Sequence, residues 1–244
     1  MSDRGDGVSK KYKTQSAFTI ISSPAADVRL SAAHQFIRSH PSSVEQLAVG
    51  DTREAVDELA RDVIKDSGAV FGIHRLSFYQ LAAGLAGPEL ARRGLVAASR
   101  LGTYAVAART AFDALADESL SYLAAVARLR SFGQALGNTL DELRRSNIDQ
   151  ALLADHGDRG TDLQILARRY DEQLTAAGLV DHAALFRTAA RSIEDPTSAT
   201  GAMTVPIGGP LLLLDVAIHD EATFALARAV WASASHVLAT VPSG

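Results

Sequence analysis

Pro210-Leu211-Leu212-Leu213-Leu214-Asp215 is the stretch that decides the fold class of this chain. A short leucine run bounded by a proline and a carboxylate suits a strand that is buried on both faces of a parallel sheet. Other short apolar or β-branched runs are also typical of strands, at 17–21, 47–49, 69–73 and 236–241. Helical periodicity separates the first three of these runs, so the sequence predicts a parallel α/β fold.

The first two helices have recognisable boundaries. Ser23-Pro24 predicts a helix start, with Ser23 as the N-cap and Pro24 at the first helical position, and His40-Pro41 predicts its end. Asp51 and Glu54 form a capping-box pattern for the second helix, and Gly68 ends it. A final helix is expected at 221–231, before the last strand.

In the middle of the chain the apolar residues recur at a different spacing from that of the flanking strand runs. Residues 76–193 are rich in Ala, Leu and Arg and are punctuated by turn signals, which predicts five or six helices and no strand. We therefore expect an α/β domain formed by 17–75 and 205–244, interrupted by a large all-helical insertion at 76–204. The polar residues 1–16 are expected to be a disordered tail.

Composition excludes several classes of protein. The chain has 244 residues and a net charge of −4, so any surface for nucleic acid must be local. It has no cysteine, which excludes disulfides and thiolate metal sites. No apolar run is long enough to span a bilayer, and the N-terminus lacks the apolar core of a signal peptide. We expect a cytoplasmic protein without a membrane partner and without a bound cofactor.

Six segments in this order resemble the first RecA-like domain of UvrD/RecB-type helicases, and above all the AddB-type subunits of helicase–nuclease complexes. The resemblance implies a RecA-like, P-loop NTPase-like sheet with a helical insertion. The segments are Ser23–Leu30 against the loop G-P-A-A-S-G-K-T, Gly50–Arg61 against the next motif, Gly72–Phe78 against T-x-H-x-F, Tyr170–Leu185 against the element ending G-L-V-D-F-x-D-L, Leu211–Asp215 against the Walker B strand, and Val237–Gly244 against the third motif.

The phosphate-binding loop departs from this family pattern at its chemical positions. Ser23 and Val28 stand where the loop has glycines, Arg29 replaces the lysine, and Leu30 replaces the Mg²⁺-binding hydroxyl. Asp27 adds a negative charge where phosphates would lie. Glycines, lysine and hydroxyl are what a phosphate cradle requires, so we expect at most a degenerate nucleotide site. The alternative for Arg29 is a solvated residue on a helix face.

The second nucleotide motif is half retained. Asp215 remains, but Val216 occupies the position of the catalytic glutamate in active family members. The alternative for Asp215 is a strand-end residue that caps a nearby turn, and Asp215, His219 and Asp220 are a weaker candidate metal cluster. The degenerate nucleotide site predicted from the sequence is Ser23, Arg29 and Asp215, without catalytic or metal-binding residues.

The resemblance implies a catalytically inactive module of a DNA repair and recombination system, which binds DNA or a helicase–nuclease partner subunit. No [DE]-x-K nuclease motif occurs in the sequence. Rival interpretations are a truncated fragment or relic of a larger AddB-like protein, and a nucleotide-binding enzyme with an atypical loop. The candidate DNA contacts are His74, Arg75, Arg144 and Arg145, with Phe78 as a stacking candidate and Arg92 and Arg93 as further phosphate contacts. The alternative for Phe78 is a ring packed on the apolar face of its helix, and the alternative for the arginines is an ordinary solvated helical face.

Overall fold

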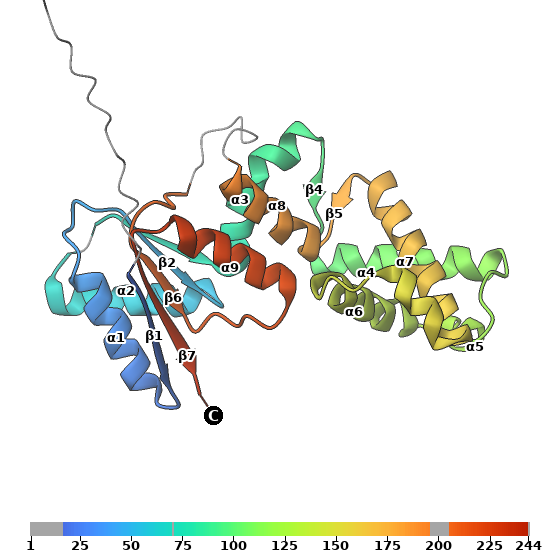
Figure 1. Ribbon diagram of the computed structural model, residues 1–244, viewed down its shortest axis with the longest axis horizontal. Coiled ribbons are helices and arrows are strands. Elements are labelled where there is room, and N and C mark those ends of the chain that lie inside the picture. Colours follow the sequence, from blue (N-terminus) through green and yellow to red (C-terminus); the bar gives the residue numbers. More distant parts are fainter. Residues whose placement is uncertain (1–16, 70, 196–204, 244) are drawn as a thin grey trace, which may run out of the picture.

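The computed structural model describes residues 17–69, 71–195 and 205–243 (Figure 1). Its main feature is a five-stranded sheet in the order β1-β7-β6-β2-β3, in which every neighbouring pair is parallel. The parallel α/β class expected from the sequence is therefore confirmed. The strands are β1 (Ala17–Ser23), β2 (Gln46–Gly50), β3 (Ile73–Ser77), β6 (Leu211–Leu214) and β7 (His236–Pro242).

Alternate residues of the central strands face opposite layers of helices. Leu211 and Leu213 of β6 face one core, whereas Leu212 and Leu214 face the other, as strand geometry requires. The core containing Leu211 also contains helices α3 (Phe78–Arg92), α8 (His182–Glu194) and α9 (Glu221–Ser233). The opposite core is covered by α1 (Ala26–Arg38) and α2 (Arg53–Ser67). Two-sided burial explains why the leucine run has no polar alternation.

A second group of helices has a core of its own and lies at the other end of the molecule from the sheet (Figure 1). Its buried residues include Leu140, Leu166 and Tyr170. We call this group the helical unit. It comprises α4 (Arg100–Ala116), α5 (Ala124–Ala127), α6 (Phe132–Arg145), the 3₁₀ helix η1 (Gln150–His156) and α7 (Asp158–Ala176).

The expectation of no strand between 76 and 193 was wrong. The short strands β4 (Val96–Ala97) and β5 (Leu179–Val180) pair in parallel where the chain enters and leaves the helical unit. Two residues cannot show a strand period, so the pattern could not reveal them. The expected boundary at 75/76 also falls inside β3, and α3 and α8 pack in the core of the sheet. The boundary at 204/205 and the tail at 1–16 adjoin or lie outside the described residues.

Several element boundaries also differ from those expected. The third strand occupies 73–77 rather than 69–73, because Gly72 has a left-handed φ of 76° and cannot continue a strand. The first helix begins at Ala26, after a turn at Ser23-Pro24 in which the Ser23 hydroxyl accepts from the Ala25 N–H. Thr52, rather than Asp51, caps α2 by accepting from the Ala55 N–H.

Within the described ranges, none of the helices combines the length and the apolar character that crossing a bilayer would require.

Candidate functional site

The carboxyl ends of neighbouring strands bring distant parts of the chain together. Ser23 is the last residue of β1, Asp215 directly follows β6, and Thr240 lies near the end of β7. These three strands are adjacent in the sheet and parallel, so their ends lie at one edge. In open α/β sheets this edge is the usual position of a ligand site.

Arg29 is the centre of this edge. Its Nε donates to Asp215 Oδ1 at 3.0 Å and its Nη2 donates to Asp215 Oδ2 at 3.0 Å, which makes a bidentate pair. Its Nη1 donates to the Ser23 carbonyl oxygen at 2.6 Å. The Arg29 side chain is only 9% exposed, so the guanidinium is held inside the fold and all three of its nitrogens have protein partners.

Thr240 fixes the other side of the Asp215 carboxylate. Its hydroxyl donates to Asp215 Oδ1 at 2.7 Å and accepts from the Asp215 backbone N–H at 3.0 Å. Asp215 has a φ of 51°, a left-handed conformation that aspartate tolerates better than most residues. Four residues, in β1, in α1, directly after β6 and in β7, thus form one hydrogen-bonded cluster, which we call the strand-end cluster: Ser23, Arg29, Asp215 and Thr240.

The connection from β1 to α1 is too short to wrap a phosphate. Only Pro24 and Ala25 lie between the strand and the helix. The position matched to the second loop glycine, Val28, is already in the first turn of α1 and is 48% exposed. A phosphate cradle needs several backbone N–H groups that curl around the anion. The two-residue connection between Ser23 and Ala26 offers no such curl.

The alternative interpretation of Arg29 as a solvated residue on a helix face is wrong, because Arg29 is buried. Asp215 does lie at the end of a strand, as its alternative expected, and its carboxylate binds the Arg29 guanidinium. Of the three residues proposed for the degenerate nucleotide site, Arg29 contacts both of the others, Ser23 and Asp215. Thr240 was missed, since a threonine inside a strand pattern gives no signal until the neighbouring strand end is known.

The candidate DNA contacts on β3 already have partners. His74 Nε2 lies 3.8 Å from the Glu45 carboxylate, and Arg75 Nη1 lies 3.2 Å from Asp57. Phe78 is 5% exposed and packs edge-on against Phe186 at 5.4 Å between ring centroids. Because its ring is enclosed in the core, Phe78 cannot stack on a base, and the alternative of a packed ring is confirmed.

Arg144, at the end of α6, ties the helical unit to α8. Its guanidinium pairs with Asp171 of α7 and with Asp181, the N-cap of α8. Asp181 is 1% exposed and also accepts from the Ala184 N–H. Burial acts to lower the pKa of Arg144, but the Asp181 and Asp171 carboxylates outweigh it and raise that pKa above its ordinary value. Arg144 is therefore part of an internal ion pair and not a free phosphate contact.

Arg145 makes the matching connection to α9. It donates to Asp141 on its own helix at 2.9 Å and to Asp220, the N-cap of α9, at 2.7 Å. Burial would raise the pKa of Asp220, but hydrogen bonds from Thr223 and the charge of Arg145 lower it. We call the ion pairs of Arg144 and Arg145 the junction cluster. Arg92 is paired as well, with Glu89 at 2.8 Å, whereas Arg93 is exposed at the end of α3.

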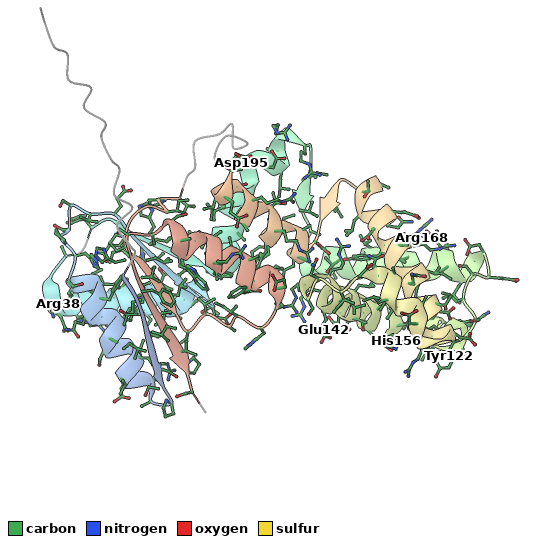
Figure 2. All side chains as sticks on the ribbon, in the orientation of Figure 1. Arg38, Tyr122, Glu142, His156, Arg168 and Asp195 are labelled. Atoms are coloured by element: carbon green, nitrogen blue, oxygen red, sulfur yellow. The ribbon has the colours of Figure 1, made fainter. Side chains whose placement is uncertain are left out.

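A cleft of about 890 Å³ lies between the helical unit and the helices α3 and α8 that pack on the sheet. One wall holds His182, whose Nε2 is buried without a hydrogen-bond partner among the described residues. Burial lowers the pKa of His182, so the ring favours its neutral form. Figure 2 shows Glu142 at this junction, between Arg38 at the sheet end and Arg168, His156 and Tyr122 on the helical unit. Other residues that line the cleft are Tyr79, Tyr104, Asn138, His219 and Asp220.

The candidate metal cluster is not assembled as such. Asp215 is bound to Arg29 and Asp220 to Arg145, so both carboxylates are already neutralised by guanidinium groups. Within 17–69, 71–195 and 205–243, no group of three or more His, Asp or Glu side chains is arranged to hold a metal ion.

The function is inferred from the geometry of the clusters described above, because two sequence comparisons found no match. The chain matches no protein-family model, and no curated protein sequence matches it.

Proposed function

We propose that this protein is a catalytically inactive, RecA-like module of an AddB-type DNA repair helicase–nuclease system, and that it binds a partner subunit without turning over nucleotide. The observation that carries the proposal is the closed strand-end cluster. The cation that takes the place of the catalytic lysine is bound by the retained Walker-type carboxylate, Asp215, and by the Ser23 carbonyl. Because the Arg29 guanidinium is already paired with a carboxylate, the cluster offers no unpaired cation to a phosphate.

The sheet order supports the RecA-like part of the proposal. A nucleotide site assembled from the phosphate-binding loop, the Walker B strand and the third family motif needs the strands that carry these motifs to be neighbours. The segments that resemble these motifs are β1, β6 and β7, and β7 lies between β1 and β6 in the sheet. The helical unit is inserted between β3 and β6, which is where the resemblance places the family's helical insertion.

Electrostatics support the absence of turnover. An incoming phosphate would have to displace Asp215 from Arg29 and would leave that carboxylate facing an anion. Asp27, exposed in the first turn of α1, adds a second negative charge nearby. An arginine fork also does not reproduce the compact ammonium of the loop lysine. All three effects oppose ATP binding.

The ion pairs favour a protein partner over DNA. Arg144 and Arg145 are neutralised by Asp171, Asp181, Asp141 and Asp220, and the whole chain carries a net charge of −4. Contacts with a phosphate backbone depend on cations that release counterions on binding. Because the strongest candidates are already paired, DNA binding through them would first require breaking the junction cluster.

Titration calorimetry with Mg²⁺–ATP tests the nucleotide part of the proposal. We expect no binding tighter than about 1 mM, either for the wild type or for Arg29→Ala. Arg38→Ala, at an exposed arginine in the last turn of the same helix, is the matched control. Micromolar affinity that is lost in Arg29→Ala and kept in Arg38→Ala would instead support the nucleotide-binding enzyme with an atypical loop.

Fluorescence anisotropy with single- and double-stranded oligonucleotides tests the choice of partner. We expect no binding at low salt. Binding that weakens as salt rises, with a log–log slope of about −0.7 to −0.9 per phosphate contact, would favour DNA over a partner subunit.

A further inference from the structure

The two edges of the sheet are protected differently. β1 forms one edge, and among the described residues its only strand neighbour is β7. Its sequence, Ala-Phe-Thr-Ile-Ile-Ser-Ser, contains no charged residue and no proline. Phe18 is 46% exposed and Ile20 is 56% exposed. Natural edge strands are usually shielded by charges, prolines, bulges or a covering element, so this edge is unusual in being uncharged and apolar.

The opposite edge, β3, has the usual protection. It contains His74 and Arg75, whose side chains lie near the acidic residues Glu45 and Asp57. Its five residues are all half-buried rather than exposed. The difference between the edges is therefore local to β1 and does not reflect a general lack of charge on the molecule.

Phe18 and Ile20 belong to a continuous apolar surface on one face of the sheet. In register, Phe18 pairs with Val237 and Ile20 with Ala239, and both partners face the core that α9 covers. The ring of Phe18 lies 5.5 Å from that of Trp231 on α9. Helix α9 covers β6 and β7 and touches β1 through the Trp231 ring, yet it leaves Phe18 and Ile20 about half exposed. We call this surface the β1 patch: Phe18, Ile20, Phe224, Trp231 and Val241.

We infer that the β1 edge pairs with the same edge of a second copy of this chain. The two β1 strands run antiparallel about a two-fold axis near Ile20, and the sheet continues across both copies. Pairing satisfies the outward-facing N–H and C=O groups of each β1 edge, which have no strand partner in the part of the chain that the structure describes. Because the axis relates identical surfaces, the contact closes as a dimer and does not propagate.

The charge pattern of the two edges favours a second copy as the occupant. In a two-fold contact each residue near the axis meets its own counterpart, so a charged strand would repel itself. β1 has no charge to repel, whereas β3 with Arg75 would bring like charges together. Antiparallel pairing also keeps Phe18 and Ile20 of both copies on one face. The two β1 patches then join over the paired strands.

The size of the β1 patch gives the approximate area that a dimer would bury. With roughly half of each large side chain exposed, the patch offers about 400 Å² of apolar surface in each copy. Together with the paired backbones, the dimer buries about 1,000 Å², at the lower end of specific interfaces. An interface of this size is typical of reversible association, and we expect a dissociation constant in the micromolar range.

Sedimentation equilibrium over about 1–200 µM protein tests this inference. The wild type should dimerise as concentration rises. Ile20→Lys and Ile20→Glu each place like charges across the axis and should each weaken the dimer by at least about tenfold. An equimolar mixture of the two variants should recover a heterodimer, because opposite charges then meet at the axis. Leu101→Lys, at a side chain 77% exposed on α4, is the matched control and should dimerise like the wild type.

Circular dichroism should show that both Ile20 variants fold, and recovery in the mixture excludes misfolding as the cause of their dissociation. A wild type that stays monomeric over the whole range would overturn the inference. So would a dimer that persists unchanged in both Ile20 variants, since the interface would then lie elsewhere.

Discussion

The strand-end cluster and the junction cluster are both built on arginines bound to two or more oxygen acceptors, yet they connect different parts of the molecule. Arg29 joins two strand ends within a single sheet. Arg144 joins helices of two separate hydrophobic cores. The carboxylates also differ, because the Asp181 side chain is 1% exposed and the Asp215 side chain is 32% exposed. One cluster joins two strand ends of the sheet, whereas the other joins the helical unit to α8.

The largest expected effect is at the junction. Arg144→Ala leaves Asp181 buried without its cation, and we expect the free energy of unfolding to fall by about 3–5 kcal/mol. Chemical denaturation monitored by circular dichroism measures this loss. Arg168→Ala, which removes an exposed arginine 4.0 Å from Glu172, should change stability by less than about 0.5 kcal/mol. A loss below about 1 kcal/mol in Arg144→Ala would mean that water reaches Asp181 and that the junction is loose.

A smaller loss is expected in the strand-end cluster. Arg29→Ala should lower the free energy of unfolding by about 2–3 kcal/mol, because Asp215 stays partly solvated and keeps the Thr240 hydroxyl as a donor. The same denaturation experiment measures it, with the exposed Arg61→Ala on α2 as the control. If Arg29→Ala lowered the free energy of unfolding more than Arg144→Ala did, the ranking of the two clusters by the exposure of their carboxylates would be wrong.

The smallest effect is a pH dependence at the cleft. Burial lowers the pKa of His182 in the folded state, whereas in the unfolded chain it should be near 6.5. Above about pH 6.5 both states carry the neutral ring and stability is complete. As the pH falls further, the unfolded chain takes up the proton first, so the free energy of unfolding decreases until the folded pKa is passed.

Stability measured from pH 8 to pH 5 tests this prediction, taken as the difference between the wild type and His182→Phe. The wild type should lose more stability than the variant on the acid side. His156→Gln, at an exposed histidine of the helical unit, should retain the wild-type slope. Parallel curves for the wild type and His182→Phe would show that His182 titrates alike in both states.

The sequence predicted the sheet better than the junction, for a physical reason. Apolar runs such as Leu211–Leu214 need burial on both faces, and parallel strands bring their carboxyl ends to one edge. Arg29 and Asp215 could therefore be placed together through motif order alone. The partners of Arg144 depend on how α6, α7 and α8 are rotated and packed. Nothing in the local pattern gives that rotation, so Arg144 and Arg145 were interpreted as outward-facing.

Short elements were the other source of error. The strands β4 and β5 are two residues long, and they exist because the ends of the helical unit meet there. The shift of β3 depended on the backbone of Gly72, whose left-handed φ ends the preceding turn. Tertiary contacts in the first case, and a single backbone angle in the second, overrode the spacing of apolar residues in the local sequence.

The pairing of β1 with β7 alone has a consequence for the order of folding. During synthesis β1 is made long before β7, and the whole helical unit is made between them. The helical unit has mostly local contacts and can condense early, whereas β1 must wait for a partner from the far end of the described chain. An uncharged apolar strand that waits unpaired is prone to aggregation. We therefore expect that molecular chaperones acting during translation bind β1 more than other strands.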